Sequence, residues 1–294
     1  MIYPSIREYI QNEAIARDYD SYYSGLELFQ LDTKILDDII REQGKILDVG
    51  CGTGRHIIHF LNKGFEVVGL DLSDHMLKIA KKKIEAQGLR PKLIKADMHN
   101  LSWMRERFDY IIVMYSTFGL IKGRTLRIKV LKDLFKLLHR NGLVIIHLYK
   151  QILGEALKFL DYKWYLRNIK WLSFDFEPGD FLIKDFRGIK DFYYHRFTLS
   201  EVKELFSLAH LRLRKIIYIH RNNQRLSANL LERFLSYSVI VVGDRISFEE
   251  ELRARLSMLD ARCSILDARS WILDLLPASR IEHPASSIEP YPKA

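Results

Sequence analysis

The feature that most constrains the fold is a short apolar segment followed at once by three closely spaced glycines. Residues 46–49 read Ile-Leu-Asp-Val, which is typical of a buried strand, and Gly50, Gly52 and Gly54 follow at alternate positions. Glycine permits the sharp bend and the close approach of a ligand to the main chain at such a junction. A helix-like pattern over 56–61 follows. We therefore expect a strand–turn–helix unit with a ligand at the turn.

The acidic residue in this strand indicates what kind of ligand the turn binds. Asp48 lies two residues before Gly50, at the carboxyl end of the predicted strand, where open α/β sheets bind their ligands. A carboxylate there would repel a pyrophosphate and attract an ammonium group. The spacing G-x-G-x-G also differs from the dinucleotide fingerprint G-x-G-x-x-G. The combination favours S-adenosylmethionine over a dinucleotide, with an ordinary tight turn as the alternative.

A second predicted strand, 65–71, also ends in an acidic residue. Asp71 lies 17 residues after Gly54, close to the spacing at which an acidic residue binds ribose hydroxyls in nucleotide sites. Its two oxygens could accept hydrogen bonds from both vicinal hydroxyls. The alternative is that Asp71 caps the helix beginning near Asp74, although Ser73 or Asp74 could serve as the cap.

Further apolar strands alternate with amphipathic helices along the chain. The remaining predicted strands are 92–96, 108–114, 142–148, 211–219 and 237–242, and the predicted helices between them include 125–139 and 199–209. This alternation is typical of a parallel sheet covered on both faces. We predict an α/β fold with a doubly wound, mostly parallel, seven-stranded Rossmann-like sheet and helices on both faces. An inserted aromatic cap and a C-terminal helix complete the prediction.

Residues 45–149 resemble the core of class I S-adenosylmethionine-dependent methyltransferases. Four motifs carry the resemblance in the family's order and at about its spacing: residues 48–54, 69–73, 96–98 and 108–112. The resemblance implies that Asp48 and the glycines hold the methionine part, Asp71 the ribose, and Asp97 and Met98 the adenine. The predicted cofactor-binding residues are Asp48, Gly50, Cys51, Gly52, Gly54, Asp71, Leu72, Asp97, Met98 and Tyr115.

Methyl transfer from a sulfonium can be catalysed largely by orientation, with a general base needed only when the acceptor must lose a proton. Tyr115, His147 and Tyr149 fall at the ends of the fourth and fifth strands and are the candidate catalytic residues. Each could equally be part of the pocket wall. No metal is expected, because Cys51 and Cys263 have neither metal-ligand nor disulfide spacing.

Three segments flank or interrupt the predicted core. Within residues 1–44, two helix-like stretches in 6–38 are separated by a tyrosine-rich segment at 18–25. Residues 1–44 should form a helical lid or, alternatively, helices that pack on the sheet edge. Residues 45–245 should form the S-adenosylmethionine-binding domain, and its aromatic insertion, 150–197, should contain a hairpin that turns at 187–188. The alternative for the insertion is a structural flap. Residues 246–294 should form a helix and a disordered tail. The leucine stripe of this helix suits a homodimer seam or packing on its own domain.

Two kinds of acceptor are compatible with the sequence. The formal net charge of +9 and the basic group Arg212, Arg214, Lys215, Arg221 and Arg225 favour polyanions such as tRNA. Residues 179–183 and 193–202 resemble tRNA wobble-uridine methyltransferases, which esterify a carboxymethyl group on uridine. The paired histidines of that family are replaced here by 115–119. A small metabolite or quinone-type acceptor is the alternative, methylated on oxygen or nitrogen. A non-catalytic binding subunit that keeps the fold is a further alternative.

Composition narrows the cellular setting that we expect. Hydrophobic residues make up 48% of the 294 residues, enough for a substantial core. No stretch approaches the roughly 18 apolar residues of a membrane helix, and the amino end lacks the apolar run of a signal peptide. We expect a cytoplasmic protein with no membrane insertion.

Overall fold

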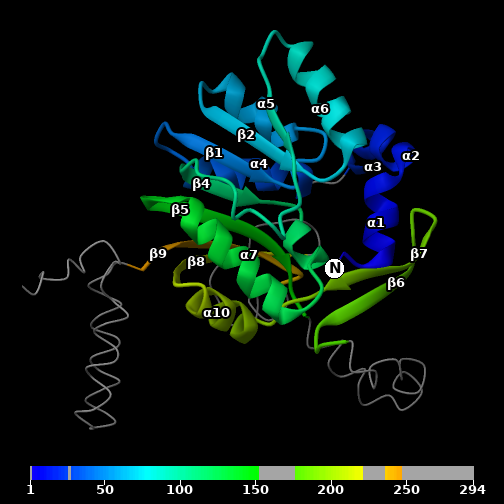
Figure 1. Ribbon diagram of the computed structural model, residues 1–294, viewed down its shortest axis with the longest axis vertical. Helices are drawn as coiled ribbons and strands as arrows, with labels where there is room; N and C mark the ends of the chain where they lie inside the picture. Colours follow the sequence, from blue (N-terminus) through cyan, green and yellow to red (C-terminus); the bar gives the residue numbers. More distant parts are fainter. Residues whose placement is uncertain (1, 26–27, 152–175, 221–235, 247–294) are drawn as a thin grey trace, which may run out of the picture. The chain divides into compact units, whose positions relative to one another are not determined.

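The computed structural model describes residues 2–25, 28–151, 176–220 and 236–246 (Figure 1). Contacts within the chain define one unit over Met1–Arg245 and another over Ile246–Ala294. Only Ile246 of the second unit is described. The predicted C-terminal helix, its dimer seam, Cys263 and much of the aromatic insertion therefore lie outside the described residues.

A seven-stranded sheet in the order β3-β2-β1-β4-β5-β9-β8 forms the centre of the first unit. The first five strands pair in parallel, while β9 runs antiparallel to both β5 and β8. The strands are β1 (Lys45–Val49), β2 (Glu66–Asp71), β3 (Lys92–Lys95), β4 (Phe108–Val113), β5 (Leu138–Tyr149), β8 (Leu211–Ile219) and β9 (Ser238–Arg245). The predicted mostly parallel, doubly wound sheet is confirmed.

Helices cover both faces of this sheet, as predicted (Figure 1). On one face, α4 (Leu28–Ile39), α5 (Arg55–Asn62) and α6 (Asp74–Glu85) pack on apolar residues of the strands. On the other face, α7 (Arg124–Leu137) and α10 (Leu199–Leu208) do so. Successive strand residues point to opposite faces, so Ile46 joins the first core and Leu47 the second.

The amino-terminal segment is more interrupted than the sequence indicated. Two helix-like stretches were expected within 6–38, but α1 (Pro4–Gln11), α2 (Glu13–Arg17) and α3 (Tyr19–Tyr23) all precede α4. Asn12 is one cause, because its side chain accepts a hydrogen bond from the Ile15 amide at 3.1 Å and caps α2. The expected break at 18–25 is itself largely helical.

The predicted hairpin forms a separate two-stranded sheet. In it, β6 (Asp180–Phe186) pairs antiparallel with β7 (Ile189–His195), and the turn lies at Arg187 and Gly188. Figure 1 shows α1 beside this hairpin, in agreement with the many contacts between α1 and β7. Between β4 and α7 the chain forms a short helix, η1 (Thr117–Leu120).

Among the described residues, no helix has the length and apolar character needed to cross a membrane. The same part of the chain contains no group of three or more His, Cys, Asp and Glu side chains able to hold a metal ion.

The absence of a side chain at Gly69 lets α5 pack closely on β2. A Cβ atom at Gly69 would lie 2.3 Å from Ile57 Cδ1 and 3.0 Å from Cys51 Sγ. We predict that Gly69→Ala lowers the free energy of unfolding by about 1–3 kcal/mol, because the added methyl group overpacks the core. Urea denaturation of both proteins measures the difference.

Gly25→Ala is the matched control, since no atom lies within 4 Å of the position that its Cβ would occupy. Its free energy of unfolding should stay within about 0.5 kcal/mol of the wild-type value. Equal stability of the two variants would contradict the packing described here.

Candidate active site

A cavity of about 540 Å³ opens at the carboxyl ends of the parallel strands. It lies where the strand order reverses between β1 and β4, the position at which open α/β sheets bind ligands. Its wall combines residues that follow β1, β2, β3, β4 and β5 with residues of the amino-terminal helices and the hairpin. Of the predicted cofactor-binding set, the wall contains Gly50, Gly52, Asp71, Leu72, Asp97, Met98 and Tyr115.

The turn after β1, residues 50–54, is called the glycine loop here. Gly50, Gly52 and Gly54 have φ values of 75°, 53° and 80°, in the left-handed region that favours glycine. A Cβ atom at Gly50 would lie 2.5 Å from Thr117 Cγ2. At Gly52 no protein atom lies within 4 Å of the corresponding position. Because Gly52 also lines the cavity, the open space above it exposes bare main chain to a ligand.

Asp71 connects the glycine loop to the end of β2. Its Oδ2 accepts a hydrogen bond from the Gly52 amide and its Oδ1 accepts one from the Ser73 amide, both at 2.8 Å. Burial raises the pKa of this carboxyl above its usual range, against the effect of these backbone donors. Ser73, and not Asp71, caps α6, since its hydroxyl accepts from the Met76 amide. The capping alternative for Asp71 was therefore wrong.

Three members of the predicted set lie behind the wall. Asp48 is 1% exposed, and its Oδ2 has no hydrogen-bond partner. Burial raises the pKa of Asp48 to about 7; Arg55 opposes this rise, while Asp71 and Asp32 add to it. Cys51 is a buried free thiol. Gly54 begins α5, and a Cβ atom there would lie 3.1 Å from Ala80 Cβ, so this glycine serves helix packing.

The loop after β3 supplies a further acidic residue to the wall. Asp97 Oδ1 accepts a hydrogen bond from the His99 amide at 2.9 Å and lies 3.1 Å from His99 Nδ1. Met98 and His99 line the cavity beside it. Asp71 and Asp97 thus mark one end of the cavity, which we call the acidic end.

The amino-terminal helices cover the cavity and are held to the core by polar contacts. Thr53 of the glycine loop donates a hydrogen bond to Asp20 at 2.6 Å, and the Ser73 hydroxyl donates to the Ile10 carbonyl at 2.7 Å. Lys83 pairs with Asp20 at 2.5 Å. Of the two interpretations of this segment, its position agrees with a cover over the cavity.

Tyrosines form much of the remaining wall. Those at the ends of β4, β5 and β9 lie on the opposite side of β1 in the strand order from Asp71 and Asp97, and we call this side of the cavity the tyrosine end. The tyrosines in the wall are Tyr9, Tyr19, Tyr22, Tyr23, Tyr115, Tyr149, Tyr194 and Tyr237. Their rings contact one another, with centroids 4.9 Å apart for Tyr23 and Tyr115 and 4.8 Å for Tyr149 and Tyr237. Rings of this kind offer flat apolar surfaces with polar tips.

Ser116 organises part of this wall. It follows Tyr115 in the left-handed region, with φ values of 60° and 51° respectively, a conformation uncommon outside glycine. Its hydroxyl oxygen accepts hydrogen bonds from the Tyr149 amide, at 3.1 Å, and from the Tyr194 hydroxyl. The chain after β4 is thereby joined to β5 and to the hairpin.

The three candidate catalytic residues occupy different positions. Tyr115 and Tyr149 line the cavity, and burial raises the pKa of both phenols, so both stay neutral near pH 7. His147 is 1% exposed and lies behind them, with its ring centroid 5.4 Å from that of Tyr149. Burial lowers the pKa of His147 to about 4, and neither ring nitrogen has a hydrogen-bond partner.

Several wall residues were not assigned to the site from the sequence. They include Tyr9, Thr117, Leu120, Phe186, Phe192, Tyr194, Arg196 and Tyr237. The tyrosine cluster at 18–25 and the aromatic insertion did indicate a cover over the site. No local motif marks Tyr237, which precedes a strand far along the chain.

The residues present fit S-adenosylmethionine. The open main chain at Gly52 offers space for a ligand. Asp48, whose buried Oδ2 atom has no hydrogen-bond partner, places an acidic group directly before the glycine loop in the chain, which suits a cationic amino acid end. Asp71 and Asp97 offer acceptors along the same cavity.

Comparison with known proteins agrees with this geometry. Residues 46–142 match the family described as a methyltransferase domain. The putative methyltransferase YqeM of Bacillus subtilis is 32% identical over 114 residues, which cover 38% of this chain and 45% of that protein. A demethylmenaquinone methyltransferase of Geobacillus kaustophilus is 32% identical over 142 residues, covering 45% and 58% respectively. The chain thus spans about half the length of these curated relatives.

Solved structures extend the likeness to the whole sheet. The crystal structure of an S-adenosylmethionine-dependent methyltransferase from Methanosarcina mazei has a TM-score of 0.57 and 20% identity, covering 72% of this chain and 98% of that one. At this identity the likeness concerns the fold. Residues 46–142 therefore form a methyltransferase domain, and the chain has the fold of S-adenosylmethionine-dependent methyltransferases.

Proposed function

We propose that this chain transfers a methyl group from S-adenosylmethionine to a small, largely apolar acceptor. The observation that carries the proposal is the different composition of the two sides of the cavity. Its acidic end joins bare glycine main chain to Asp71 and Asp97, and its tyrosine end contains Tyr115, Tyr149 and Tyr237. A cavity of about 540 Å³ is in the range of small-molecule sites, about 300–1,000 Å³.

The acidic end would bind the cofactor. Asp71 would accept hydrogen bonds from the ribose hydroxyls through lone pairs not used by Gly52 and Ser73. Asp97 and Met98 would contact the adenine. Asp48 would stabilise the ammonium group electrostatically from behind the glycine loop, because a buried carboxyl whose Oδ2 lacks a hydrogen-bond partner is stabilised in its charged form by a nearby cation.

The tyrosine end would orient the second substrate. S-adenosylmethionine, when bound, supplies a methyl group already activated on sulfonium. The neutral tyrosines would hold a flat acceptor by ring contacts and hydroxyl groups and would exclude water. Because burial raises the pKa of Tyr115 and Tyr149, neither is suited to act as a tyrosinate base. Orientation would be the main contribution of this wall.

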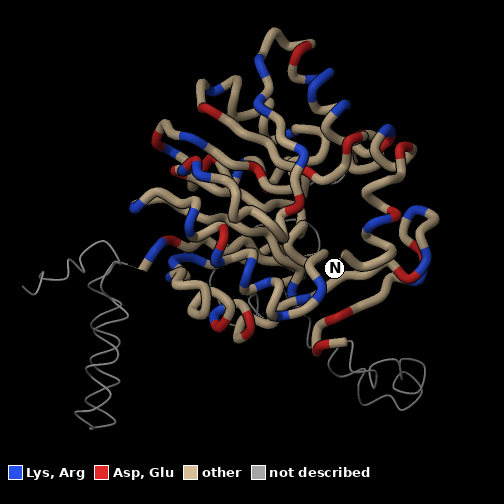
Figure 2. Tube along the Cα trace, viewed as in Figure 1, with Lys and Arg blue, Asp and Glu red and all other residues tan. Residues whose placement is uncertain are grey.

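A small acceptor is favoured over tRNA by the cover and by the surface charge. The amino-terminal helices and the hairpin both contribute to the cavity wall. Arg212 and Arg214, in the basic group that suggested RNA, both pair with Asp244, and Figure 2 shows acidic residues beside many of the basic ones. Arg221 and Arg225 of that group lie outside the described residues. A demethylmenaquinone methyltransferase among the relatives agrees with a small acceptor.

The proposal predicts where a labelled methyl group will go. The full chain is incubated with S-adenosylmethionine carrying a tritiated methyl group, either with a small-molecule cell extract or with total tRNA. Label should enter small molecules. Label found only in tRNA would contradict the acceptor class. Saturable cofactor binding with no transfer to either pool would instead indicate a non-catalytic binding subunit.

Asp71 gives a direct test of the ribose assignment. We predict that Asp71→Ala weakens S-adenosylmethionine binding by about 1–3 kcal/mol, because buried polar groups lose their partner. Isothermal titration calorimetry measures the affinity, and circular dichroism verifies folding.

Asp74→Ala is the matched control. Asp74 begins α6 three residues later and forms an exposed ion pair with Lys95, so its removal should leave cofactor affinity unchanged. If Asp71→Ala binds as tightly as Asp74→Ala, Asp71 does not hold the ribose.

We predict that Asp48 releases a proton when the cofactor binds. Its pKa of about 7 in the free protein leaves the carboxyl about half protonated at pH 7, and a nearby ammonium group lowers that pKa. Binding at pH 7 should therefore release about half a proton more from the wild type than from Asp48→Asn. Calorimetry in buffers of different ionisation enthalpy measures this difference.

The pH dependence supplies the internal control. At pH 9 Asp48 is already ionised in the free protein, so the difference between the two proteins should vanish there. A difference that is absent at pH 7, or unchanged at pH 9, would show that Asp48 does not sense the cofactor.

A further inference from the structure

Strand β7 presents alternate residues to two different environments. Phe192, Tyr194 and, just beyond the strand, Arg196 line the cavity. Between them, Tyr193 and His195 are 0% exposed and face the opposite way, as strand geometry requires. The same seven-residue strand therefore contributes to the cavity wall on one side and to a buried polar cluster on the other.

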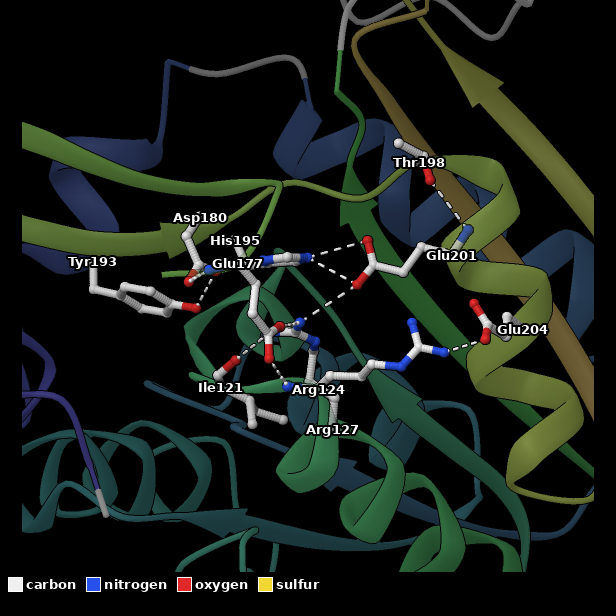
Figure 3. A network of polar contacts seen from close by, with 10 residues as sticks. All are labelled: Ile121, Arg124, Arg127, Glu177, Asp180, Tyr193, His195, Thr198, Glu201 and Glu204. Carbon is white, nitrogen blue, oxygen red and sulfur yellow. Dashed lines mark hydrogen bonds and ion pairs between the residues drawn. The ribbon is translucent and has the colours of Figure 1, made fainter. Parts of the chain in front are cut away.

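His195 is at the centre of this cluster (Figure 3). Its Nδ1 lies 2.6 Å from Asp180 Oδ1, and its Nε2 lies 3.0 Å and 3.2 Å from the two oxygens of Glu201. The side chains of His195 and Asp180 are fully buried, and that of Glu201 is 14% exposed. Both ring nitrogens therefore face carboxyl oxygens.

This arrangement favours a protonated ring. A neutral imidazole has one donor and one acceptor nitrogen. Its acceptor nitrogen would face a carboxylate oxygen, which is also an acceptor, and no hydrogen bond could form between them. An imidazolium donates from both. Burial disfavours the charge, but the hydrogen bonds to Asp180 and Glu201 outweigh it and raise the pKa of His195 above its usual value.

The two carboxylates are in turn attached to the core. Arg127, whose side chain is 1% exposed, lies 3.4 Å from Glu201 and also pairs with Glu177. Asp180 accepts hydrogen bonds from the Glu177 amide at 2.9 Å and from the Tyr193 hydroxyl at 2.6 Å. Because Arg127 belongs to α7 and Glu201 to α10, His195 joins the hairpin to two helices of the methyltransferase core.

Close packing leaves this part of β7 little room to shift. A Cβ atom at Gly179 would lie 2.8 Å from His195 Cε1, and one at Gly119 would lie 2.9 Å from the His195 carbonyl oxygen. The two glycines let the backbone of neighbouring segments approach β7 on either side. The contacts of His195 therefore help to fix Tyr194 and Arg196 on either side of it, together with the hydrogen bond from the Tyr194 hydroxyl to Ser116.

We propose that His195 is a positioning residue for the acceptor: held between Asp180 and Glu201, it fixes the side of β7 that lines the cavity and so determines acceptor affinity. The inference rests on the proposed methyl transfer. It assigns no contact between His195 and either substrate. A positioning role also explains why a buried cluster of charges, which is costly compared with apolar packing, lies directly behind the part of β7 that lines the cavity.

His195→Gln in the full chain tests the proposal, with Glu201→Gln as a milder second variant. Methyl transfer is measured over a dilution series of small-molecule extract, which separates the half-saturating extract concentration from the maximal rate. The half-saturating concentration should rise about tenfold or more, as expected when a buried charged hydrogen bond is lost, with a smaller change in maximal rate. Affinity for S-adenosylhomocysteine, measured by calorimetry, should stay within about twofold.

His139→Gln is the matched control. His139 is 49% exposed, pairs with Asp109 and lies at the opposite end of β5 from the cavity. It should behave as the wild type. An unchanged half-saturating concentration in a folded His195→Gln protein that still transfers methyl groups would overturn the proposal.

Two measurements do not depend on methyl transfer and keep the proposal testable if the proposed function is wrong. Nitrogen-15 resonances of the wild-type His195 ring should show both nitrogens protonated at pH 7, and amide hydrogen exchange in β6 and β7 should accelerate about tenfold or more in His195→Gln. Exchange in β1 should not change. A neutral His195 ring, or unchanged exchange in the hairpin, would overturn the positioning role.

The pH profile gives the sign of the effect. The folded-state pKa of His195 is raised. Its stabilising contribution to the hairpin is therefore complete below the ordinary histidine pKa and is lost as pH rises through the folded-state pKa. The groups that face it are Asp180, Glu201, Arg127, Glu177 and Tyr193. The half-saturating concentration should rise with pH in the wild type and stay flat in His195→Gln. Parallel profiles would contradict the proposal.

Discussion

The hydrogen bond from the Gly52 amide to the Asp71 carboxylate joins the ends of the two strands on which the site depends. The turn that carries this amide has a left-handed backbone at Gly50 and Gly52, a conformation that glycine adopts without steric cost. The same carboxylate also accepts from Ser73 at the start of α6. One acidic group therefore sets the relative positions of the glycine loop, the end of β2 and a helix terminus. The acidic end of the cavity follows from that arrangement.

The two ends of the cavity come from different parts of the chain. The residues that match the methyltransferase domain family, 46–142, include the glycine loop, Asp71, Asp97 and Tyr115. Most of the wall tyrosines, including Tyr9, Tyr149 and Tyr194, lie outside that range. The matched domain thus contains the residues that we propose bind the cofactor, while attached segments supply most of the aromatic wall that we propose binds the acceptor. The buried cluster around His195 is the connection that ties one of these attachments to the core.

The sheet, its parallel strands and both helix layers could be predicted because continuous apolar strands and glycine turns are local signals. The hairpin was also predicted, since Arg187 and Gly188 separate two alternating segments. The depth of side chains could not be predicted in the same way. Asp48 and Asp71 lie near the ends of β1 and β2, yet Asp48 is buried and absent from the cavity wall, whereas Asp71 lines the cavity. The alternation of β7 between wall and buried cluster depends on contacts with α7 and α10, which are distant in sequence.

We propose that the cavity at the carboxyl ends of the strands binds S-adenosylmethionine with its ribose at Asp71 and its amino acid part along the glycine loop. A crystal structure of the full chain with S-adenosylhomocysteine is the most direct test. We expect the ribose hydroxyls within hydrogen-bonding distance of the Asp71 carboxylate and the homocysteine part against Gly50 and Gly52. Density for the ligand outside this cavity, or a ribose that contacts neither Asp71 oxygen, would contradict it.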